Sequence, residues 1–297
     1  MKADWIAVDW GTTHLRAWAM GANGIMAEAS SDEGMSRLGR DAFEPALLHL
    51  IEPWLGPGVT RVLACGMVGS RQGWHEAPYR AVPCPPLEPG FLARVPVRDP
   101  RITMQIAPGL KQVSPPDVMR GEETQIAGAL SLQPAFDGAI CLPGTHSKWC
   151  RISAGEVAGF QTFLTGELFA LLSEHSVLRH SLTEGWDDPA FDAGVAEGLR
   201  PEHLLTQLFR LRAEGLIVPV PALPRARLSG LLIGGELADA KGWWLGLPIL
   251  LVGSDRLTAL YARALLAQGA SARCLPATAC TIAGLARAAT PLSKAAE

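Results

Sequence analysis

Residues 5–20 read Trp5-Ile6-Ala7-Val8-Asp9-Trp10-Gly11-Thr12-Thr13-His14-Leu15-Arg16-Ala17-Trp18-Ala19-Met20. The apolar stretches 5–9 and 15–20, on either side of a Gly-Thr-Thr turn, predict a β-hairpin. A second turn at 21–24 leads into a third predicted antiparallel strand over 25–30. A helix over 43–54 and a short buried strand over 62–65 are expected next.

A second series with a similar beginning starts at residue 139. Ala139 to Leu142 predicts a short apolar strand, Pro143 to Trp149 a turn, and Cys150 to Ser153 another strand. Strand, Gly-Thr turn and strand therefore occur twice, with very low identity between the copies. The remaining elements predicted are a strand and four helices: strand 249–252 and helices 165–176, 201–213, 229–241 and 255–268.

Together these patterns predict an α/β fold made of two ribonuclease-H-like domains that face a central cleft, where small ligands usually bind. We place the N-terminal domain at 1–117 and the C-terminal domain at 118–297. The proline-rich stretch 83–116 is expected to form loops and short strands. Pro201 suits the first turn of the helix over 201–213, and Gly215 suits its C-terminal cap.

Composition limits the function classes. The chain has 297 residues, of which 48% are hydrophobic and 19% charged, as in a globular protein. Its net charge of -3 gives no electrostatic reason to expect nucleic acid or an anionic membrane as a partner. We expect a cytoplasmic protein, because the sequence shows no signal peptide, no apolar run of about 20 residues and no close cysteine pair.

The first turn has the chemistry of a phosphate-binding loop. Gly11 lets the backbone approach a ligand closely, and Thr12 and Thr13 offer N–H and hydroxyl groups to phosphate oxygens. Asp9 ends an apolar strand, where a carboxylate is costly to bury without a partner. We expect Asp9 to orient a magnesium ion through water. The alternative is a β-turn that Asp9 merely caps.

The turn at 144–148 repeats this chemistry. Gly144 and Thr145 match the first loop, so two such hairpins could clamp a polyphosphate from both sides. Lys148 is either a phosphate contact or a solvated charge on a strand. His146 has no partner histidine at ligand spacing, so we expect it to form hydrogen bonds rather than bind a metal.

Two acidic residues open a helix between the loops. Glu122 and Glu123 follow Arg120-Gly121, and acidic side chains at a helix N-terminus are ordinary dipole partners. A kinase, however, needs a carboxylate to accept or orient the proton of the attacking hydroxyl. Glu122 is the first candidate and Glu123 the second.

The segment 69–79 mixes hydrogen-bond donors with aromatic side chains and predicts a substrate-binding wall. Ser70 and Arg71 supply polar groups, with Arg71 suited to a carboxylate, while Trp74 and Tyr79 could pack against sugar carbons. An ordinary surface loop is the alternative. Gly234 and Gly253 could let a flat adenine approach the backbone, although helix packing accounts for them almost as well.

These residues resemble the sugar kinases of the actin, hexokinase and Hsp70 superfamily. More narrowly, the sequence is similar to the 2-dehydro-3-deoxygalactonokinase family in six separated motifs: 9–16, 66–70, 119–125, 143–149, 165–168 and 229–234. The resemblance implies an actin-like ATPase fold and ATP-dependent phosphorylation of 2-dehydro-3-deoxy-D-galactonate on its terminal 6-hydroxyl. It assigns Asp9, Gly11, Thr12, Thr13, Gly144 and Thr145 to MgATP binding and leaves open which glutamate acts.

Two alternatives remain at this point. The chain could be a kinase for another sugar or sugar acid of the same fold, or a nucleotide- or sugar-binding regulator without catalysis. Retention of Asp9 and Glu122 speaks against the regulator. We expect the sugar acid to bind the N-terminal domain and adenosine the C-terminal domain. The expected partner is a small-molecule substrate, and a homodimer is left open.

Overall fold

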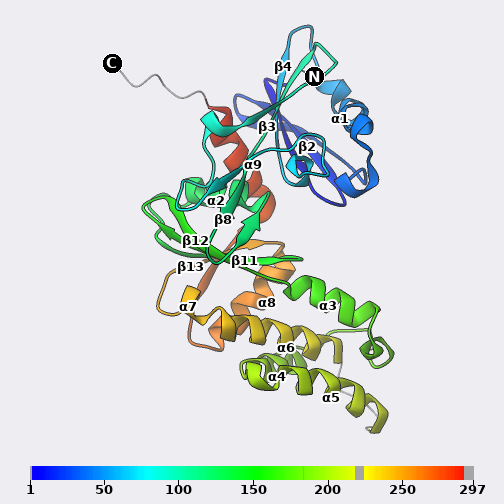
Figure 1. Cartoon of the computed structure of the whole chain (residues 1–297), viewed down its shortest axis with the longest axis vertical. Coiled ribbons are helices and arrows are strands. Elements are labelled where there is room, and N and C mark those ends of the chain that lie inside the picture. The colour runs from blue at the N-terminus through cyan, green and yellow to red at the C-terminus, as the bar shows by residue number, and fades with distance from the viewer. Residues whose placement is uncertain (1, 183, 218–223, 291–297) are drawn as a thin grey trace. The chain divides into compact units, whose positions relative to one another are not determined.

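The computed structural model describes residues 2–182, 184–217 and 224–290. The chain divides into two compact units, each built around a sheet (Figure 1). Unit 1 comprises Met1–Phe136, Ala154–Ala158 and Ala277–Glu297, and unit 2 comprises Asp137–Ser153 and Gly159–Pro276. The division of function at residues 117 and 118 stays a prediction.

The sheet of unit 1 has the strand order β3-β2-β1-β4-β7-β6. Strands β1, β2 and β3 pair antiparallel, β1 pairs parallel with β4, and β4 pairs parallel with β7. Their bounds are β1 Trp5–Trp10, β2 Leu15–Gly21, β3 Gly24–Ser31, β4 Thr60–Cys65, β6 Ala93–Val95 and β7 Ile102–Ile106. The predicted hairpin, third strand and fourth strand are therefore confirmed.

The sheet of unit 2, to which β12 contributes its residues from Gly159 onward, repeats this order as β12-β11-β10-β13-β14. Strands β10 and β11 pair antiparallel, and β10, β13 and β14 run parallel. Their bounds are β10 Gly138–Leu142, β11 Ser147–Ser153, β12 Glu156–Phe163, β13 Ile249–Gly253 and β14 Ala272–Pro276. Every residue of β10 and β13 is buried, which explains why both read as continuous apolar runs. The predicted internal repeat is thus a repeat of topology.

The described part of unit 1 contains three α-helices, one between β3 and β4 in the sequence and two after the last strand of its sheet. They are α1 Phe43–Ile51, α2 Glu122–Leu132 and α9 Ala277–Ala289. Helices α2 and α9 pack closely because glycine lies at their crossing: a Cβ on Gly284 would stand 2.0 Å from the backbone oxygen of Thr124. The proline-rich stretch 83–116 forms the short strands β6, β7 and β8, as predicted. Strand β8 Gly109–Gln112 joins β5 Tyr79–Ala81 and β9 Asp117–Met119 in a separate small sheet.

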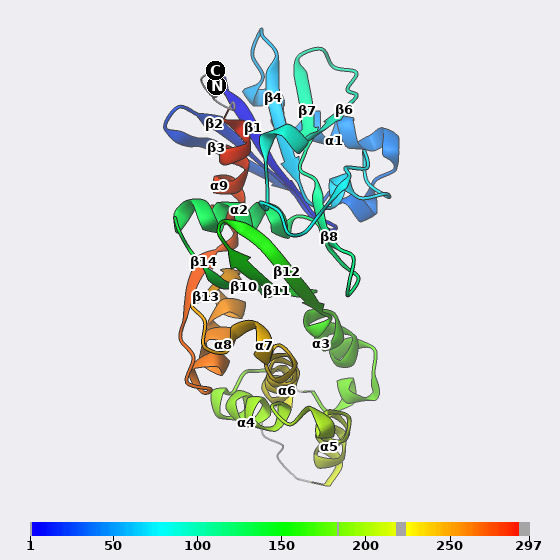
Figure 2. The same ribbon diagram turned by 60° about the vertical axis from the view of Figure 1, so that its left-hand side comes forward.

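Unit 2 carries a larger helical part, in which α4 and α5 lie farther from the sheet than α6 and α7 (Figures 1 and 2). Its helices are α3 Thr165–Glu174, α4 Asp188–Gly198, α5 Leu204–Ile217, α6 Pro224–Asp239, α7 Lys241–Trp244 and α8 Asp255–Leu266. Helices α4 and α6 cross on glycines, since a Cβ on Gly230 would meet the Phe191 backbone oxygen at 2.1 Å. The predicted cap at Gly215 is wrong: α5 continues through it to Ile217.

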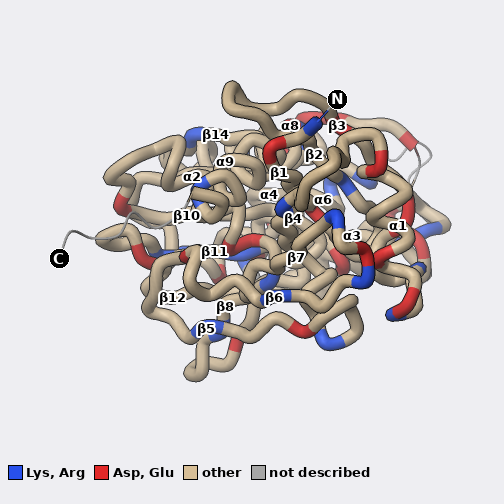
Figure 3. The backbone as a smooth tube through the Cα atoms, turned by 90° about the horizontal axis from the view of Figure 1, so that it is seen from above, with Lys and Arg blue, Asp and Glu red and all other residues tan. Residues whose placement is uncertain are grey.

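The fold class predicted from the sequence, two ribonuclease-H-like α/β halves, is confirmed by the shared strand order. Basic and acidic positions are interspersed along the described backbone of both units, in keeping with the small net charge (Figure 3). The six cysteines all lie in the described ranges, and none of them forms a disulfide. Within the described ranges, no helix combines the length and apolarity needed to cross a membrane.

Candidate active site

Asp9 lies near the end of β1, directly opposite Arg16 on β2. Nη2 of Arg16 donates to Oδ2 of Asp9, and Nη1 of the same guanidinium lies 3.3 Å from Oγ1 of Thr278 on α9. The carboxylate is thus paired although it is mostly withdrawn from solvent. Arg16 therefore compensates the carboxylate charge of Asp9 at the end of this apolar strand.

The loop after β1 is held from behind by the segment 34–36. Backbone N–H groups of Met35, Ser36 and Gly34 donate to the carbonyls of Gly11, Thr12 and Thr13 over 3.0, 3.0 and 3.1 Å. A Cβ on Gly34 would stand 2.2 Å from the carbonyl carbon of Thr13, so only glycine allows this approach. The side chains of Thr12 and Thr13 remain exposed. The loop is therefore fixed through its carbonyls and presents its hydroxyls outward.

The end of β4 brings Asp9 close to the start of α2. Cys65 Sγ lies 4.0 Å from Oδ1 of Asp9, and a Cβ on Gly121 would lie 3.3 Å from the Cα of Gly66. Both glycines have positive φ, 93° at Gly66 and 105° at Gly121. Burial, together with the charges of Asp9 and Glu123, raises the pKa of the Cys65 thiol well above its usual value. The end of β4 thus places the buried thiol of Cys65 beside Asp9 and the next residue, Gly66, against the residue before α2.

The two glutamates at the start of α2 differ in environment. Oε2 of Glu122 accepts the backbone N–H of Arg120 at 3.0 Å, and the residue is half-buried. Glu123 is fully buried and accepts from the backbone N–H of Gly121 at 2.6 Å and from Oγ1 of Thr124 at 2.9 Å. Burial, followed by the neighbouring charge of Glu122, raises the pKa of Glu123 to about 7. Glu122 therefore keeps partial solvent access, whereas Glu123 is enclosed by the protein.

Part of the segment 69–79, predicted to bind substrate, packs against other side chains and is half-buried. Arg71 is exposed, whereas Trp74 is half-buried and stacks on Phe43 with centroids 6.3 Å apart. Tyr79 is half-buried, with the guanidinium carbon of Arg120 4.3 Å above its ring. The roles of Arg71, Trp74 and Tyr79 in binding a sugar stay predictions.

Two buried side chains near this wall have polar atoms without a hydrogen-bond partner among the described residues. These atoms are Oγ of Ser70 and Nε and Nη1 of Arg120. Nη2 of Arg120 donates to the backbone oxygen of Ala77 at 2.7 Å. A buried cation that is only partly satisfied favours an anionic neighbour. No local sequence pattern singles out Arg120.

The second Gly-Thr loop, 143–148 in unit 2, is supported by the N-terminus of α3. The backbone N–H of Glu167 donates to the Thr145 carbonyl at 2.9 Å, and the Glu167 carboxylate pairs with His146. A Cβ on Gly166 would stand 2.3 Å from the Gly144 carbonyl oxygen, whereas one on Gly144 meets no protein atom within 4 Å. Gly144 therefore has an open face at which a ligand could lie.

His146 and Lys148 differ in exposure: His146 is exposed, whereas Lys148 is buried. His146 forms a hydrogen bond, as expected from its spacing. Lys148 is only 4% exposed, and its Nζ donates to the carbonyl of His146 at 3.1 Å, which excludes a solvated strand charge. Its contact with phosphate stays a prediction.

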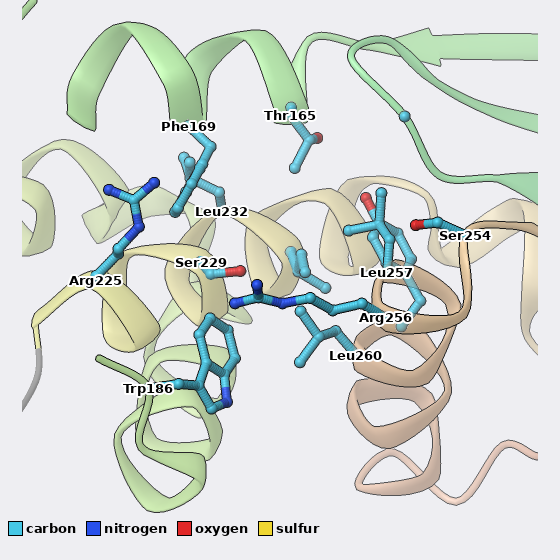
Figure 4. Close-up of a pocket in the computed structure, with 14 residues that line it drawn as sticks. Thr165, Phe169, Trp186, Arg225, Ser229, Leu232, Ser254, Arg256, Leu257 and Leu260 are labelled. Carbon is cyan, nitrogen blue, oxygen red and sulfur yellow. The ribbon is translucent and has the colours of Figure 1, made fainter. Parts of the chain in front are cut away.

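A cavity of about 250 Å³ adjoins this loop in unit 2 (Figure 4). Gly144, Thr165 and Phe169 line it together with side chains from α6 and α8, including Ser229, Leu232, Leu257 and Leu260. Arg256 lies over the ring of Trp186, with its guanidinium carbon 5.2 Å from the ring centroid. The cavity is therefore largely apolar, with cationic and hydroxyl groups on its walls.

The two glycines predicted to contact adenine lie beside this cavity rather than among its lining residues, although Ile233 and Ser254, their neighbours, line it. A Cβ on Gly234 would meet the Val195 backbone oxygen at 2.4 Å, so helix packing requires that glycine. A Cβ on Gly253 would lie 3.4 Å from the Pro143 backbone oxygen. Contact of either glycine with adenine stays a prediction.

Fold and loops together define a class of protein, the actin-like ATPases and sugar kinases. Component A of the (R)-2-hydroxyglutaryl-CoA dehydratase of Acidaminococcus fermentans is only 10% identical to this chain. It nevertheless superposes with a TM-score of 0.52 over 96% of this chain and 99% of its own. Such a likeness establishes the fold alone.

Closer matches establish the family. The 2-keto-3-deoxy-galactonokinase family matches residues 9–288. "Probable 2-dehydro-3-deoxygalactonokinase DgoK1" of Rhizobium meliloti is 39% identical over 95% of both chains, and the Escherichia coli 2-dehydro-3-deoxygalactonokinase is 38% identical over 91% of both. A Sinorhizobium meliloti crystal structure assigned to the same enzyme has a TM-score of 0.88 and 38% identity, covering 99% of this chain and 98% of that one. The chain belongs to the 2-keto-3-deoxy-galactonokinase family.

Proposed function

We propose that this protein is an ATP-dependent kinase that phosphorylates 2-dehydro-3-deoxy-D-galactonate on its terminal 6-hydroxyl, a step of galactonate breakdown. Family membership and the names of the relatives support this reaction. The observation that carries the proposal is the packing at the end of β4. Cys65 Sγ lies 4.0 Å from Oδ1 of Asp9, and the next residue, Gly66, lies against Gly121, directly before Glu122 and Glu123. That arrangement supports the proposal, because it brings the hairpin proposed to bind phosphate close to a carboxylate that could accept a proton.

Glu122 is the residue we propose to accept the proton of the attacking hydroxyl. Its side chain is half-buried and reachable, whereas Glu123 is fully buried. Glu123 lies beneath it as a second acidic group whose pKa is raised by burial to about 7. Positioning a carboxylate within hydrogen-bond reach of the hydroxyl is the central requirement for this kind of catalysis.

ATP is the proposed phosphoryl donor. Gly11, Thr12 and Thr13 in unit 1 and Gly144, Thr145, His146 and Lys148 in unit 2 are proposed phosphate contacts. The apolar cavity that begins at Gly144 suits the adenosine part of ATP, because its walls combine aliphatic and aromatic side chains with a few polar groups. Adenosine binding in the C-terminal domain, 118–297, is thereby supported.

Asp9 is the proposed protein group toward magnesium. No group of three or more His, Cys, Asp or Glu residues that could hold a metal occurs in the described part of the chain. A single carboxylate acting through water fits magnesium, which usually keeps several waters and binds substrate phosphates. When bound, the ion would offset the negative charge of those phosphates.

The sugar acid is proposed to bind in the N-terminal domain, 1–117, through the segment 70–79. Arg71 is exposed and suits the carboxylate of the substrate, while Trp74 and Tyr79 offer partly accessible rings to its carbon chain. The buried, incompletely paired guanidinium of Arg120 adds positive potential near Ser70. We expect an acid to bind better than the corresponding neutral sugar.

A coupled ADP-release assay against a panel of sugar acids and neutral sugars tests the proposal. The expected result is turnover that needs both magnesium and ATP and is highest with 2-dehydro-3-deoxy-D-galactonate. If turnover were highest with a different sugar acid, that acid would become the assigned substrate and the protein would still be a sugar-acid kinase. No turnover on any member of the panel would refute the kinase assignment.

A further inference from the structure

Glu236 on α6 is a buried carboxylate in unit 2, only 4% exposed. Three donors converge on it: Nε1 of Trp149 at 2.8 Å, the hydroxyl of Tyr261 at 2.7 Å, and Oγ1 of Thr165. The Tyr261 hydroxyl is also hydrogen-bonded to Oγ of Ser147 at 2.9 Å. None of the ion pairs found in the described part of the chain includes Glu236.

The donors belong to the elements that frame the second Gly-Thr loop and the adjoining cavity. Ser147 and Trp149 begin β11, directly after the loop, and Thr165 begins α3. Tyr261 on α8 and Thr165 both line the cavity. One carboxylate therefore links the strand after the loop, the helix that supports it, and the far wall of the cavity.

Burying this network destabilises the fold unless each of its polar groups has a hydrogen-bond partner. Burial raises the pKa of Glu236, while the hydrogen bonds from Thr165, Tyr261 and Trp149 lower it. A buried carboxylate is destabilising by several kcal/mol unless donors compensate, and an apolar residue of similar size is often the more stable choice. Glu236 accepts from three neutral donors and pairs with no cation among the described residues. This indicates that it fixes the positions of β11, α3 and α8.

We propose that Glu236 is a positioning residue for nucleotide binding: it holds the loop 143–148 and the cavity walls in the arrangement that accepts ATP or ADP. Loss of the carboxylate removes the shared acceptor of Trp149, Thr165 and Tyr261, so β11, α3 and α8 lose their common hydrogen-bond partner. This inference rests on the proposed use of ATP. It makes nucleotide affinity, rather than sugar-acid affinity, the property that depends on Glu236.

The direct test is Glu236→Ala, with ADP affinity measured by calorimetry and the KM of each substrate measured by ADP release. We expect the Kd of ADP and the KM of ATP to rise about 10- to 100-fold, as for loss of a charged hydrogen-bond partner. The KM of the sugar acid should change by less than about twofold. Glu236→Gln should recover most of the affinity, because its amide oxygen can accept from Trp149 while the hydroxyls of Thr165 and Tyr261 accept from its NH2 group.

Glu197→Ala is the matched control. Glu197 on α4 also pairs with a side chain of α6, its Oε1 lying 2.8 Å from Nη2 of Arg227, but it does not line the cavity. This variant should lower the melting temperature and leave ADP affinity unchanged. If Glu236→Ala does not fold, Tyr261→Phe and Thr165→Val remove single donors and should each weaken ADP binding about 3- to 10-fold.

The outcomes separate the two proposals. Unchanged ADP affinity in a folded Glu236→Ala protein, or in both single-donor variants, overturns the role of Glu236. So does an equal rise in both KM values, because that pattern signals general loosening. A wild-type protein that binds ADP but phosphorylates no sugar refutes the proposed function alone, provided Glu236→Ala still weakens ADP binding. A wild-type protein that binds no nucleotide overturns both.

Discussion

The two units share a strand order and a Gly-Thr turn after the first strand, yet the side chains around that turn differ in kind between the units. In unit 1 the turn lies near charged groups: Asp9 paired with Arg16, and the acidic start of α2. In unit 2 the turn carries the His146–Glu167 pair and is followed by the buried Lys148. Neutral donors gather around Glu236 at the next strand, and an apolar cavity adjoins the turn. The difference suggests that one copy of the repeat serves phosphoryl transfer and the other serves nucleotide binding.

Glu122→Gln should give the largest difference between the two units, because it should lower the catalytic rate without changing nucleotide affinity. Removing the proposed proton acceptor should lower kcat about 100- to 10,000-fold with little change in the Kd of ADP. Steady-state kinetics and calorimetry on one preparation give both values. Full activity in both Glu122→Gln and Glu123→Gln would show that neither glutamate accepts the proton.

Arg71→Gln should affect the sugar acid alone. Loss of a charge-assisted contact to its carboxylate should raise the KM of the acid about 10- to 100-fold and leave the KM of ATP unchanged. Arg40→Gln is a suitable control, since the Arg40 guanidinium donates to the backbone oxygen of Arg71 over 3.1 Å. Equal effects of the two substitutions would assign Arg71 to loop structure instead of substrate binding.

A pair of glycine variants sharpens the description of the second loop. Gly166→Ala would place Cβ 2.3 Å from the Gly144 carbonyl oxygen and should destabilise the protein by about 1–3 kcal/mol. Gly144→Ala has free space and should keep the melting temperature while weakening ADP binding. Unchanged ADP affinity in Gly144→Ala would remove that loop from the nucleotide site.

A further expected effect is a pH dependence of stability. Glu123 has a pKa of about 7 in the folded protein against an ordinary value of 4.5, so the folded state binds the proton more tightly. Its favourable contribution is complete below about pH 4.5 and is lost as the pH rises through 7, with a magnitude of about 3 kcal/mol. Urea denaturation of wild type and Glu123→Gln at pH 5 to 8 should show a shallower pH dependence in the variant. Parallel curves would contradict the assignment.

Local patterns predicted the sheets and loops well because those features depend on neighbouring residues. The hairpin at 5–20, the buried strand at 249–252 and the helix beginning at Asp255 were all readable from apolar spacing and turn residues. Gly215 was misread as a cap because an isolated glycine inside a helix looks like one near its end.

Long-range contacts could not be predicted in this way. Glu236 follows two glycines in an apolar helix, and its partners Trp149 and Thr165 lie 87 and 71 residues away in the sequence. The packing role of Gly234 likewise depends on a second helix, through Val195. Such features follow from which elements the topology brings together rather than from local pattern.

The division of labour between the two copies is tested most directly by measuring phosphoryl-transfer rate and ADP affinity side by side in Glu122→Gln and Glu236→Ala. We predict that Glu122→Gln loses the rate and keeps ADP affinity within about twofold, while Glu236→Ala loses ADP affinity about 10- to 100-fold and recovers much of its rate at saturating ATP. Loss of ADP affinity in Glu122→Gln, together with normal affinity in Glu236→Ala, would contradict the account.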